Sequence, residues 1–311
     1  MTHPFRFGVQ MNTATDGTSW SDTARRIESL GFSTLVMPDH FEDQLAVGPA
    51  LAVAAEATTT LRVGALVFGN DYRHPVVLAK DMATLDVLSG GRMEFGIGAG
   101  WMRTDYDAAG MSYDRPGERI ERMLESIEII RGLFGDGPVD FQGEHYSITG
   151  LDGRPKPIQS PPPLLIGGGG KRMLTIAAQQ ADIVGITANL RAGAVGPDAV
   201  ADITPARFDE KLAWVADAAG DRMDRIELNS LVMTTQIVDD QQAAIEATAA
   251  MFGLDPADAA ASPLLLIGSV DQIVRQLEER RERWGFSYFI VQGIETAMAL
   301  EPVVARLAGT V

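Results

Sequence analysis

The feature that most constrains this chain is a regular alternation between short apolar runs and segments with helical spacing. Eight runs are rich in β-branched or aromatic residues, and several are apolar nearly throughout, as in parallel strands buried on both faces. These runs predict strands over Phe5–Met11, Thr34–Met37, Leu61–Phe68, Arg92–Ala99, Leu164–Gly167, Ile183–Thr187, Ile226–Thr234 and Tyr288–Gln292.

Start and stop residues mark the helices that are predicted between these strands. Ser21–Leu30 ends at Gly31, and Val76–Leu88 begins after a proline and ends before Gly90 and Gly91. Further helices are predicted over Pro116–Phe134, Arg172–Ala181, Pro205–Ala219 and Val270–Trp284. Alternating strands and helices give a parallel sheet with right-handed crossovers, and eight units close a barrel. The chain is therefore predicted to be α/β, with a single (β/α)8 TIM barrel spanning residues 1–311.

The alternative fold is an open, doubly wound sheet. That fold favours a G-x-G-x-x-G turn after the first strand, and residues 12–17 read N-T-A-T-D-G instead. Two segments interrupt the repeat: about 135–163, which contains a hairpin-like stretch at Val139–Ile148, and about 239–263, which is Ala-rich and helical. We expect both insertions on the C-terminal face of the barrel, where active sites are built.

Composition narrows the possible partners and compartments. A net charge of −16 and a pI near 4.6 disfavour nucleic acid and anionic membrane surfaces as partners. With no cysteine, the chain cannot form disulfides, thiolate nucleophiles or Cys-ligated metal centres. The first residues carry no cleavable apolar signal, and the stretch Leu45–Ala55 is too short to span a bilayer. We therefore expect a cytoplasmic protein.

The end of the second predicted strand carries a candidate for proton transfer. This strand leads into Asp39 and His40, and functional residues of barrels lie at the carboxyl ends of strands. An imidazole changes its protonation near neutral pH, so His40 could donate or accept a proton. The alternative for a single histidine in this place is a structural hydrogen bond.

Glycines mark the ends of the fourth and fifth predicted strands. Gly96, Gly98 and Gly100 leave one face without side chains, which would admit a flat ring or, alternatively, close packing of another backbone. Residues 167–170 are four glycines that open a helix starting at Lys171. Such a run exposes backbone N–H groups at a helix N-terminus and predicts a phosphate site; a flexible connector is the alternative.

Several other chemistries lack support in the sequence. None of the four lysines (Lys80, Lys156, Lys171 and Lys211) ends a strand, which disfavours a Schiff-base aldolase. No His/carboxylate cluster has metal-ligand spacing, so no metal is expected, and no G-x-S-x-G elbow occurs. The remaining features suit a phosphorylated planar cofactor, although a phosphosugar isomerase would share most of them.

Several motifs resemble the luciferase-like monooxygenase family. They lie at residues 61–64, 74–80, 84–92, 96–101 and 161–170, together with Gly110 and Arg119. The resemblance covers essentially the whole chain, most strongly residues 5–185. It implies the barrel fold and a flavin- or deazaflavin-dependent oxidoreductase.

Within that family, Asp39-His40-Phe41 is similar to a triplet of glucose-6-phosphate dehydrogenases that depend on the deazaflavin coenzyme F420. The resemblance implies that His40 and Trp101 are catalytic, and that the bond between Leu66 and Val67 is a non-prolyl cis peptide or a bulge. The cofactor-binding residues that it implies are Asp39, His40, Leu66, Val67, Gly98, Thr104, Gly168, Gly169, Gly170 and Arg191.

The chain departs from the sugar-phosphate enzymes at positions that would contact a substrate. The predicted substrate pocket comprises Gln10, Asn12, Gln44 and Trp101. Those enzymes carry Trp at the position of Gln44 and an acidic residue at the position of Trp101, and many relatives carry Glu in place of Asp105. Their phosphate-site lysine aligns with Leu190, and Arg191 is the nearest replacement. These departures argue against glucose 6-phosphate and leave the proton relay open.

Three readings of function remain. The first is hydride transfer between coenzyme F420 and a small organic substrate. The second is an FMN-dependent monooxygenase that uses reduced flavin and O2 and needs a separate flavin reductase. The third is a non-catalytic flavin-binding protein. The resemblance also implies a homodimer.

Overall fold

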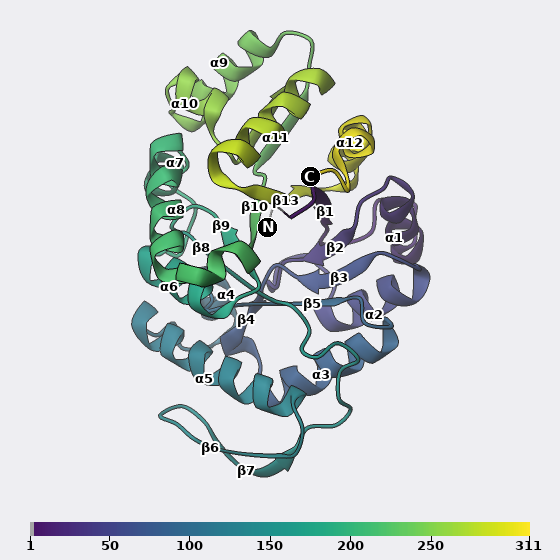
Figure 1. Ribbon diagram of the computed structural model, residues 1–311, viewed down its shortest axis with the longest axis vertical. Helices are drawn as coiled ribbons and strands as arrows, with labels where there is room; N and C mark the ends of the chain where they lie inside the picture. The colour runs from purple at the N-terminus through teal and green to yellow at the C-terminus, as the bar shows by residue number, and fades with distance from the viewer. Residues whose placement is uncertain (1–2) are drawn as a thin grey trace.

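The computed structural model describes residues 3–311 and contains a closed barrel of parallel strands surrounded by helices (Figure 1). The strands pair in the order β3-β2-β1-β13-β10-β9-β8-β5, and β5 closes the barrel by pairing with both β3 and β4. The predicted (β/α)8 barrel is therefore confirmed. Its strands are β1 (Arg6–Gln10), β2 (Thr34–Met37), β3 (Arg62–Ala65), β4 (Phe68–Gly69), β5 (Met93–Gly98), β8 (Leu164–Gly168), β9 (Ile183–Ile186), β10 (Glu227–Leu231) and β13 (Phe286–Gln292).

Capping residues set the helix boundaries. Ser19 accepts a hydrogen bond from an N–H group of the first turn of α1, and Ser269 and Gln272 form a capping box at the start of α11. Helix α11 ends at Gly285, whose φ of 82° suits glycine. The helices are α1 (Trp20–Ser29), α2 (Val47–Ala57), α3 (Pro75–Leu88), α4 (Arg103–Ala109), α5 (Pro116–Phe134), α6 (Lys171–Gln180), α7 (Pro197–Ala201), α8 (Pro205–Ala219), α9 (Gln241–Phe252), α10 (Pro256–Ala261), α11 (Val270–Trp284) and α12 (Ile294–Leu307), with short 3-10 turns η1 (Asn70–Tyr72) and η2 (Gly220–Arg225).

All eight predicted strands are present, but two of them are interrupted. The third divides into β3 and β4, and the seventh ends early as β10, with only its last residue in the next strand, β11 (Thr234–Ile237). Strand β11 pairs in parallel with β12 (Leu265–Gly268) in a small second sheet that the sequence did not predict. Helix α12 was also not predicted, and it contains Pro302, a residue that usually interrupts a helix.

The first insertion does not lie where it was expected. It connects α5 to β8, so it begins after a helix and therefore on the amino-terminal side of the barrel. Its strands β6 (Pro138–Gln142) and β7 (Ser147–Asp152) form an antiparallel hairpin outside α5 (Figure 1). Glu125 of α5 fixes the hairpin by accepting hydrogen bonds from the backbone N–H groups of residues 144–146. The expectation of a C-terminal-face position was wrong, because it treated the segment as one that follows a strand.

The second insertion follows a strand, as expected. The chain leaves the carboxyl end of β10 through β11 and then forms α9 and α10. Ile245 and Ala249 of α9 pack with Leu265 and Ile267 of β12 in a small buried cluster. This packing gives the insertion its own apolar contacts beside the barrel, next to α11 (Figure 1).

Ion pairs fill the amino-terminal half of the barrel interior. Arg6 of β1 pairs with Glu94 of β5 (2.5 Å) and with Glu227 of β10 (2.7 Å), and Arg62 of β3 also pairs with Glu94 (2.7 Å). The Arg6 guanidinium lies 3.6 Å from the centre of the Tyr288 ring. Burial alone would raise the pKa of Glu94, but Arg6 and Arg62 hold that pKa below its ordinary value.

Candidate active site

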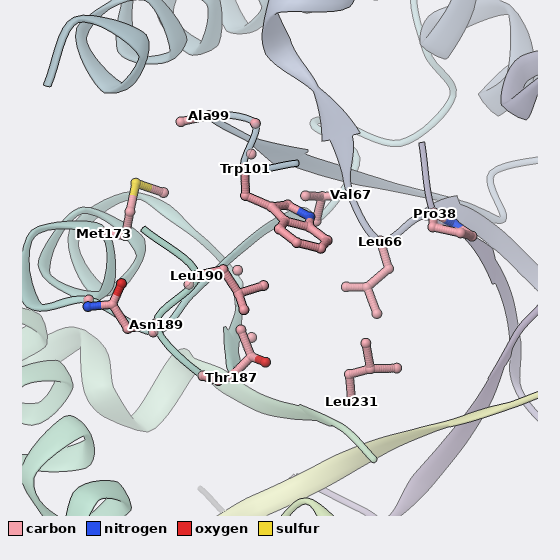
Figure 2. Close-up of a pocket in the computed structure, with 18 of the residues that line it drawn as sticks. Pro38, Leu66, Val67, Ala99, Trp101, Met173, Thr187, Asn189, Leu190 and Leu231 are labelled. Carbon is pink, nitrogen blue, oxygen red and sulfur yellow. The ribbon is translucent and has the colours of Figure 1, made fainter. Parts of the chain in front are cut away.

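A cavity of about 690 Å³ opens at the carboxyl ends of the barrel strands. All eight strand positions contribute to it, either from the last residues of a strand or from the loop that follows. Figure 2 shows Trp101, Leu66, Leu190 and Leu231 around one open space. This is the face on which TIM-barrel enzymes place their active sites.

His40 is held in this cavity by a buried carboxylate. Its Nδ1 atom lies 2.6 Å from Oδ2 of Asp105, which is buried on α4. Tyr72 donates its hydroxyl to the same oxygen (3.1 Å), and the backbone N–H of Phe41 donates to Oδ1 (3.3 Å). Burial, and then Asp105, raise the pKa of Tyr72, so Tyr72 remains a neutral donor. Because Asp105 occupies Nδ1, the Nε2 atom of His40 is left for a ligand.

Asp39 is engaged by the protein itself. Its Oδ2 accepts a hydrogen bond from the N–H group of Gly69 (2.9 Å), and Arg73 pairs with both carboxylate oxygens (2.5 and 2.9 Å). A bidentate pair of this kind fixes geometry as well as charge. Asp39 therefore ties the end of β2 to the segment after β4, and this places His40, the next residue.

The segment between β3 and β4 packs on the glycines of β5. The peptide bond between Leu66 and Val67 is cis, which confirms the prediction for this bond. A Cβ atom at Gly98 would lie 2.6 Å from Cγ2 of Val67, and one at Gly96 would lie 2.1 Å from the carbonyl oxygen of Ala65. These two glycines thus admit neighbouring protein atoms. Of the alternatives that the sequence left open, close packing of another strand explains Gly96.

The glycine run ends β8 and leads into α6. Gly170 immediately precedes α6, and no side chain caps this helix. The first N–H groups of a helix have no partner within it, and together with the helix dipole they favour an anion. A Cβ atom at Gly169 would lie 2.3 Å from the backbone of Ala188, so the loop after β9 requires glycine there. The run is therefore both a packing contact and a row of possible backbone donors.

Arg119 is a buried cation in the cavity wall. It lies in the first turn of α5, is 3% exposed, and donates from Nη1 to the carbonyl oxygen of Gly100 (2.7 Å). Its Nε atom has no hydrogen-bond partner, and among residues 3–311 no carboxylate lies within ion-pair distance of its side chain. The guanidinium lies 4.1 Å from the centre of the Tyr113 ring. A buried charge without an acidic partner favours an anionic ligand.

Charge is distributed unequally around the cavity. Three further cations, Lys171, Arg172 and Arg191, line it from the start of α6 and from the loop after β9. Arg172 also pairs with Glu121 at the surface (2.9 Å). The side formed by β1, β10 and β13 is lined instead by uncharged residues, namely Gln10, Asn12, Asn229, Leu231, Met233 and Gln292.

Most of the predicted site residues line this cavity. They are Gln10, Asn12, Asp39, His40, Leu66, Val67, Gly98, Trp101, Gly168, Gly169, Gly170 and Arg191. Gln44 and Thr104 are not in its lining. The amide nitrogen of Gln44 donates to the carbonyl oxygen of Pro38 (2.9 Å), and Thr104 is exposed on α4.

The sequence-based prediction missed several residues of the site. Asp105 was noted only as a departure from relatives, and Arg119 only as part of a motif. Asn229 and Gln292 were not noted; Gln292 ends the predicted strand Tyr288–Gln292, whereas Asn229 lies inside the predicted strand Ile226–Thr234. The signal for Gln292 was a polar residue at a strand end, and the signal for Asn229 was a polar residue within an otherwise largely apolar strand.

Residues 3–311 contain neither a grouped set of metal ligands nor a membrane-spanning helix. No group of three or more His, Asp or Glu side chains there is arranged to hold a metal ion. No helix of the same residues is long and apolar enough to cross a membrane.

Comparison with known proteins identifies the class of this barrel. The model of the luciferase-like monooxygenase family matches residues 1–252. The chain therefore belongs to this family.

Relatives of the chain use two kinds of cofactor. The chain is 31% identical over 147 residues to an F420-dependent glucose-6-phosphate dehydrogenase of Amycolatopsis mediterranei, covering 45% of this chain and 44% of the relative. It is 32% identical over 105 residues to an FMNH(2)-dependent dimethylsulfone monooxygenase of Pseudomonas fluorescens, covering 34% and 29%. The chain thus spans half or less of these two relatives.

The fold is similar to solved structures over nearly its whole length. The coenzyme F420 dependent tetrahydromethanopterin reductase of Methanopyrus kandleri superposes with a TM-score of 0.77 and 21% identity, covering 97% of this chain and 98% of that chain. This similarity extends the barrel assignment beyond the segments that match the sequence relatives.

Proposed function

We propose that this protein transfers a hydride between coenzyme F420 and a small organic substrate. The observation that carries the proposal is the pair of His40 and Asp105 at one side of a cavity whose other side is cationic. Membership of a family with F420-dependent relatives supports the same assignment.

The residues present fit a phosphorylated planar cofactor. The glycines at 168–170 and the unpaired N–H groups at the start of α6 would hold a phosphate. The buried guanidinium of Arg119 would balance the negative charge of that phosphate. Leu66, Val67 and Trp101 offer apolar surface to a ring. When bound, the deazaflavin would supply the hydride chemistry.

His40 would accept or donate the proton whose transfer accompanies that of the hydride. In the tautomer whose Nδ1–H donates to Asp105, Nε2 of His40 is a proton acceptor. When a substrate hydroxyl is oxidised to a carbonyl, Nε2 takes the hydroxyl proton and Asp105 stabilises the resulting imidazolium. In the reverse direction the same atom returns the proton.

The cationic side of the cavity favours the deazaflavin over FMN. Coenzyme F420 carries an acidic tail beyond its phosphate, whereas FMN ends at its phosphate. A chain of net charge −16 would repel such a tail unless local cations reverse the sign of the potential. Lys171, Arg172 and Arg191 are exposed and supply that positive charge.

The test is a calorimetric titration of the protein with coenzyme F420 and with FMN. We expect the smaller dissociation constant for coenzyme F420. Gly170→Ala should weaken binding of either cofactor by about tenfold, since it obstructs charge-assisted hydrogen bonds to the phosphate. The new Cβ would lie 3.3 Å from the side chain of Asn189, so the fold can accommodate it with a small shift.

Gly48→Ala is the matched control. A Cβ atom at Gly48 meets nothing within 4 Å, and Gly48 is not in the cavity lining, so both dissociation constants should stay unchanged. Tighter binding of FMN, together with O2-dependent turnover of reduced FMN, would replace the proposal by the monooxygenase reading. Binding of a cofactor with no turnover of any alcohol, ketone or aldehyde would favour the flavin-binding protein.

A further inference from the structure

We propose that the uncharged side of the cavity binds an uncharged substrate that carries hydrogen-bond donors. We call this side the amide floor and define it by Gln10, Asn229 and Gln292, which come from β1, β10 and β13. The inference rests on the proposed function, because it assumes that the cationic side holds the phosphate of a cofactor. It assigns the substrate class of the same site.

The first argument is the separation of charge within one cavity. Arg119, Lys171, Arg172 and Arg191 all lie on α5, at the start of α6 or in the loop after β9. Asp39 is the one carboxylate among the lining residues, and Arg73 neutralises it. No lining residue on β1, β10 or β13, or in the segment just after β10, is ionisable. A phosphate or carboxylate placed there would lose its hydration without gaining a counter-charge.

The second argument is the orientation of the three amides. Gln10 donates its amide N–H to the carbonyl oxygen of Leu66 (3.4 Å), Asn229 to that of Tyr288 (3.2 Å), and Gln292 to that of Val232 (3.1 Å). Because each partner is a carbonyl, these contacts fix which end of each amide is the nitrogen. Within residues 3–311 none of the three amide oxygens accepts a hydrogen bond. The amide floor therefore offers acceptors to a ligand.

The third argument is the apolar surface beside the amides. Leu231 and Met233 follow the amide of β10, and Figure 2 shows Leu231 facing Leu66 across the open space below Trp101. The rings of Trp101 and His40 lie edge to face, with their centres 5.6 Å apart. A ligand on the amide floor would thus have an apolar body near the imidazole that moves the proton. This combination suits a neutral alcohol or ketone with an additional hydroxyl or N–H group.

The experiment compares matched ligand pairs on the protein loaded with cofactor. Each pair is an uncharged alcohol and its phosphate ester, such as cyclohexanol with cyclohexyl phosphate and cyclohexane-1,2-diol with its monophosphate. Saturation-transfer NMR measures binding independently of turnover. We expect the uncharged member to bind at least about tenfold more tightly, and the diol to bind more tightly than cyclohexanol.

Gln292→Lys sharpens the test by adding a cation to the amide floor. This change should raise KM for uncharged substrates with little change in kcat, and should improve binding of the phosphate esters by about tenfold. Gln242→Lys, on the exposed face of α9 and outside the cavity lining, is the matched control and should change neither quantity. Circular dichroism melting checks that both variants fold.

Three outcomes separate this inference from the proposed function. If coenzyme F420 does not bind but the protein loaded with FMN still binds the uncharged members preferentially, the proposed function fails and the amide floor stands. If the phosphate esters bind as tightly as the alcohols in the unaltered protein, the inference is overturned. A panel in which no uncharged compound binds overturns it as well.

Discussion

The two ends of the barrel interior are both polar, but they differ in how completely their polar groups are paired. At the amino-terminal end, Arg6, Arg62, Glu94 and Glu227 form a closed set of ion pairs. At the carboxyl end, Arg119 is buried without an acidic partner, and the oxygens of the amide floor accept no hydrogen bond from residues 3–311.

This difference indicates that the amino-terminal end of the barrel stabilises the fold and the carboxyl end binds ligands. Buried polar groups that satisfy each other specify and hold the fold, and removing one of them exposes its partners to an unfavourable environment. Polar groups of the cavity that stay incompletely paired within the protein keep their interaction energy for a ligand. Substitutions at the amino-terminal end should therefore change stability, while those at the carboxyl end should change binding and turnover.

The largest expected effect is a loss of stability caused by a substitution at the amino-terminal end of the barrel. Glu94→Ala leaves the Arg6 and Arg62 charges without their shared carboxylate and should lower the free energy of unfolding by about 3–5 kcal/mol. Urea denaturation followed by circular dichroism measures this. Arg306→Ala removes an ion pair at the surface and is the control, with an expected change below about 1 kcal/mol. Equal effects of the two changes would contradict a stabilising role for the ion pairs at the amino-terminal end.

The next effect is at the carboxyl end and concerns turnover. His40→Ala should lower kcat by about 100-fold, the usual scale for losing a positioned acid or base, with cofactor affinity within about threefold of the unaltered protein. Asp105→Asn should lower kcat less, because it keeps an acceptor for Phe41 but not the negative charge beside the imidazole. Steady-state kinetics and thermal melting measure both variants. Unchanged kcat in His40→Ala would assign His40 to a structural role.

A third prediction uses pH to test pairing near the amino-terminal end. Glu28 accepts hydrogen bonds from the backbone N–H groups of residues 59–61, just before β3. Burial opposes its charge, but these bonds lower its pKa from 4.5 to about 2. Its stabilising contribution is therefore full above about pH 4.5 and is lost as the pH falls toward 2.

Glu28→Gln should accordingly destabilise the protein by about 1.5 kcal/mol at pH 7, the scale of charge-assisted hydrogen bonds. The difference between the two proteins should shrink steadily between pH 4.5 and 2. Thermal melts across this range test the idea. A difference that stays constant with pH would show that the charge of Glu28 does not matter.

The smallest expected effect is a change in cofactor affinity caused by a substitution at the cationic side of the cavity. Arg191→Ala should weaken binding of coenzyme F420 by about threefold at low salt, because an exposed cation attracts the acidic tail through a screened potential. FMN binding should stay unchanged, and the effect on F420 should vanish at high salt. Arg225→Ala, an exposed arginine outside the cavity lining, is the control. Equal weakening of both cofactors would place Arg191 at the shared phosphate instead.

Local sequence patterns predicted much of this molecule. The boundaries of α5, α8 and α11 agree with the predicted ranges, because each combines helical spacing with a clear start and stop. The strands were found for a similar reason, since buried parallel strands are short apolar runs. Helix α2 was not recognised, because its Ala-rich sequence gives little contrast between a buried and an exposed face.

The sequence alone determined which residues stand at the ends of strands, and this was enough to find His40 and the glycines at 168–170. Leu66 and Val67 were found through the family resemblance. Only the tertiary structure decided which of these groups meet. His40 and Asp105 are 65 positions apart, and the amide floor joins β1, β10 and β13 because β13 lies between β10 and β1 in the closed barrel. Spacing along a chain carries no information about such distant pairs. The same closure leaves Arg119 without an acidic partner among residues 3–311 on one side of the cavity and places uncharged amides on the other.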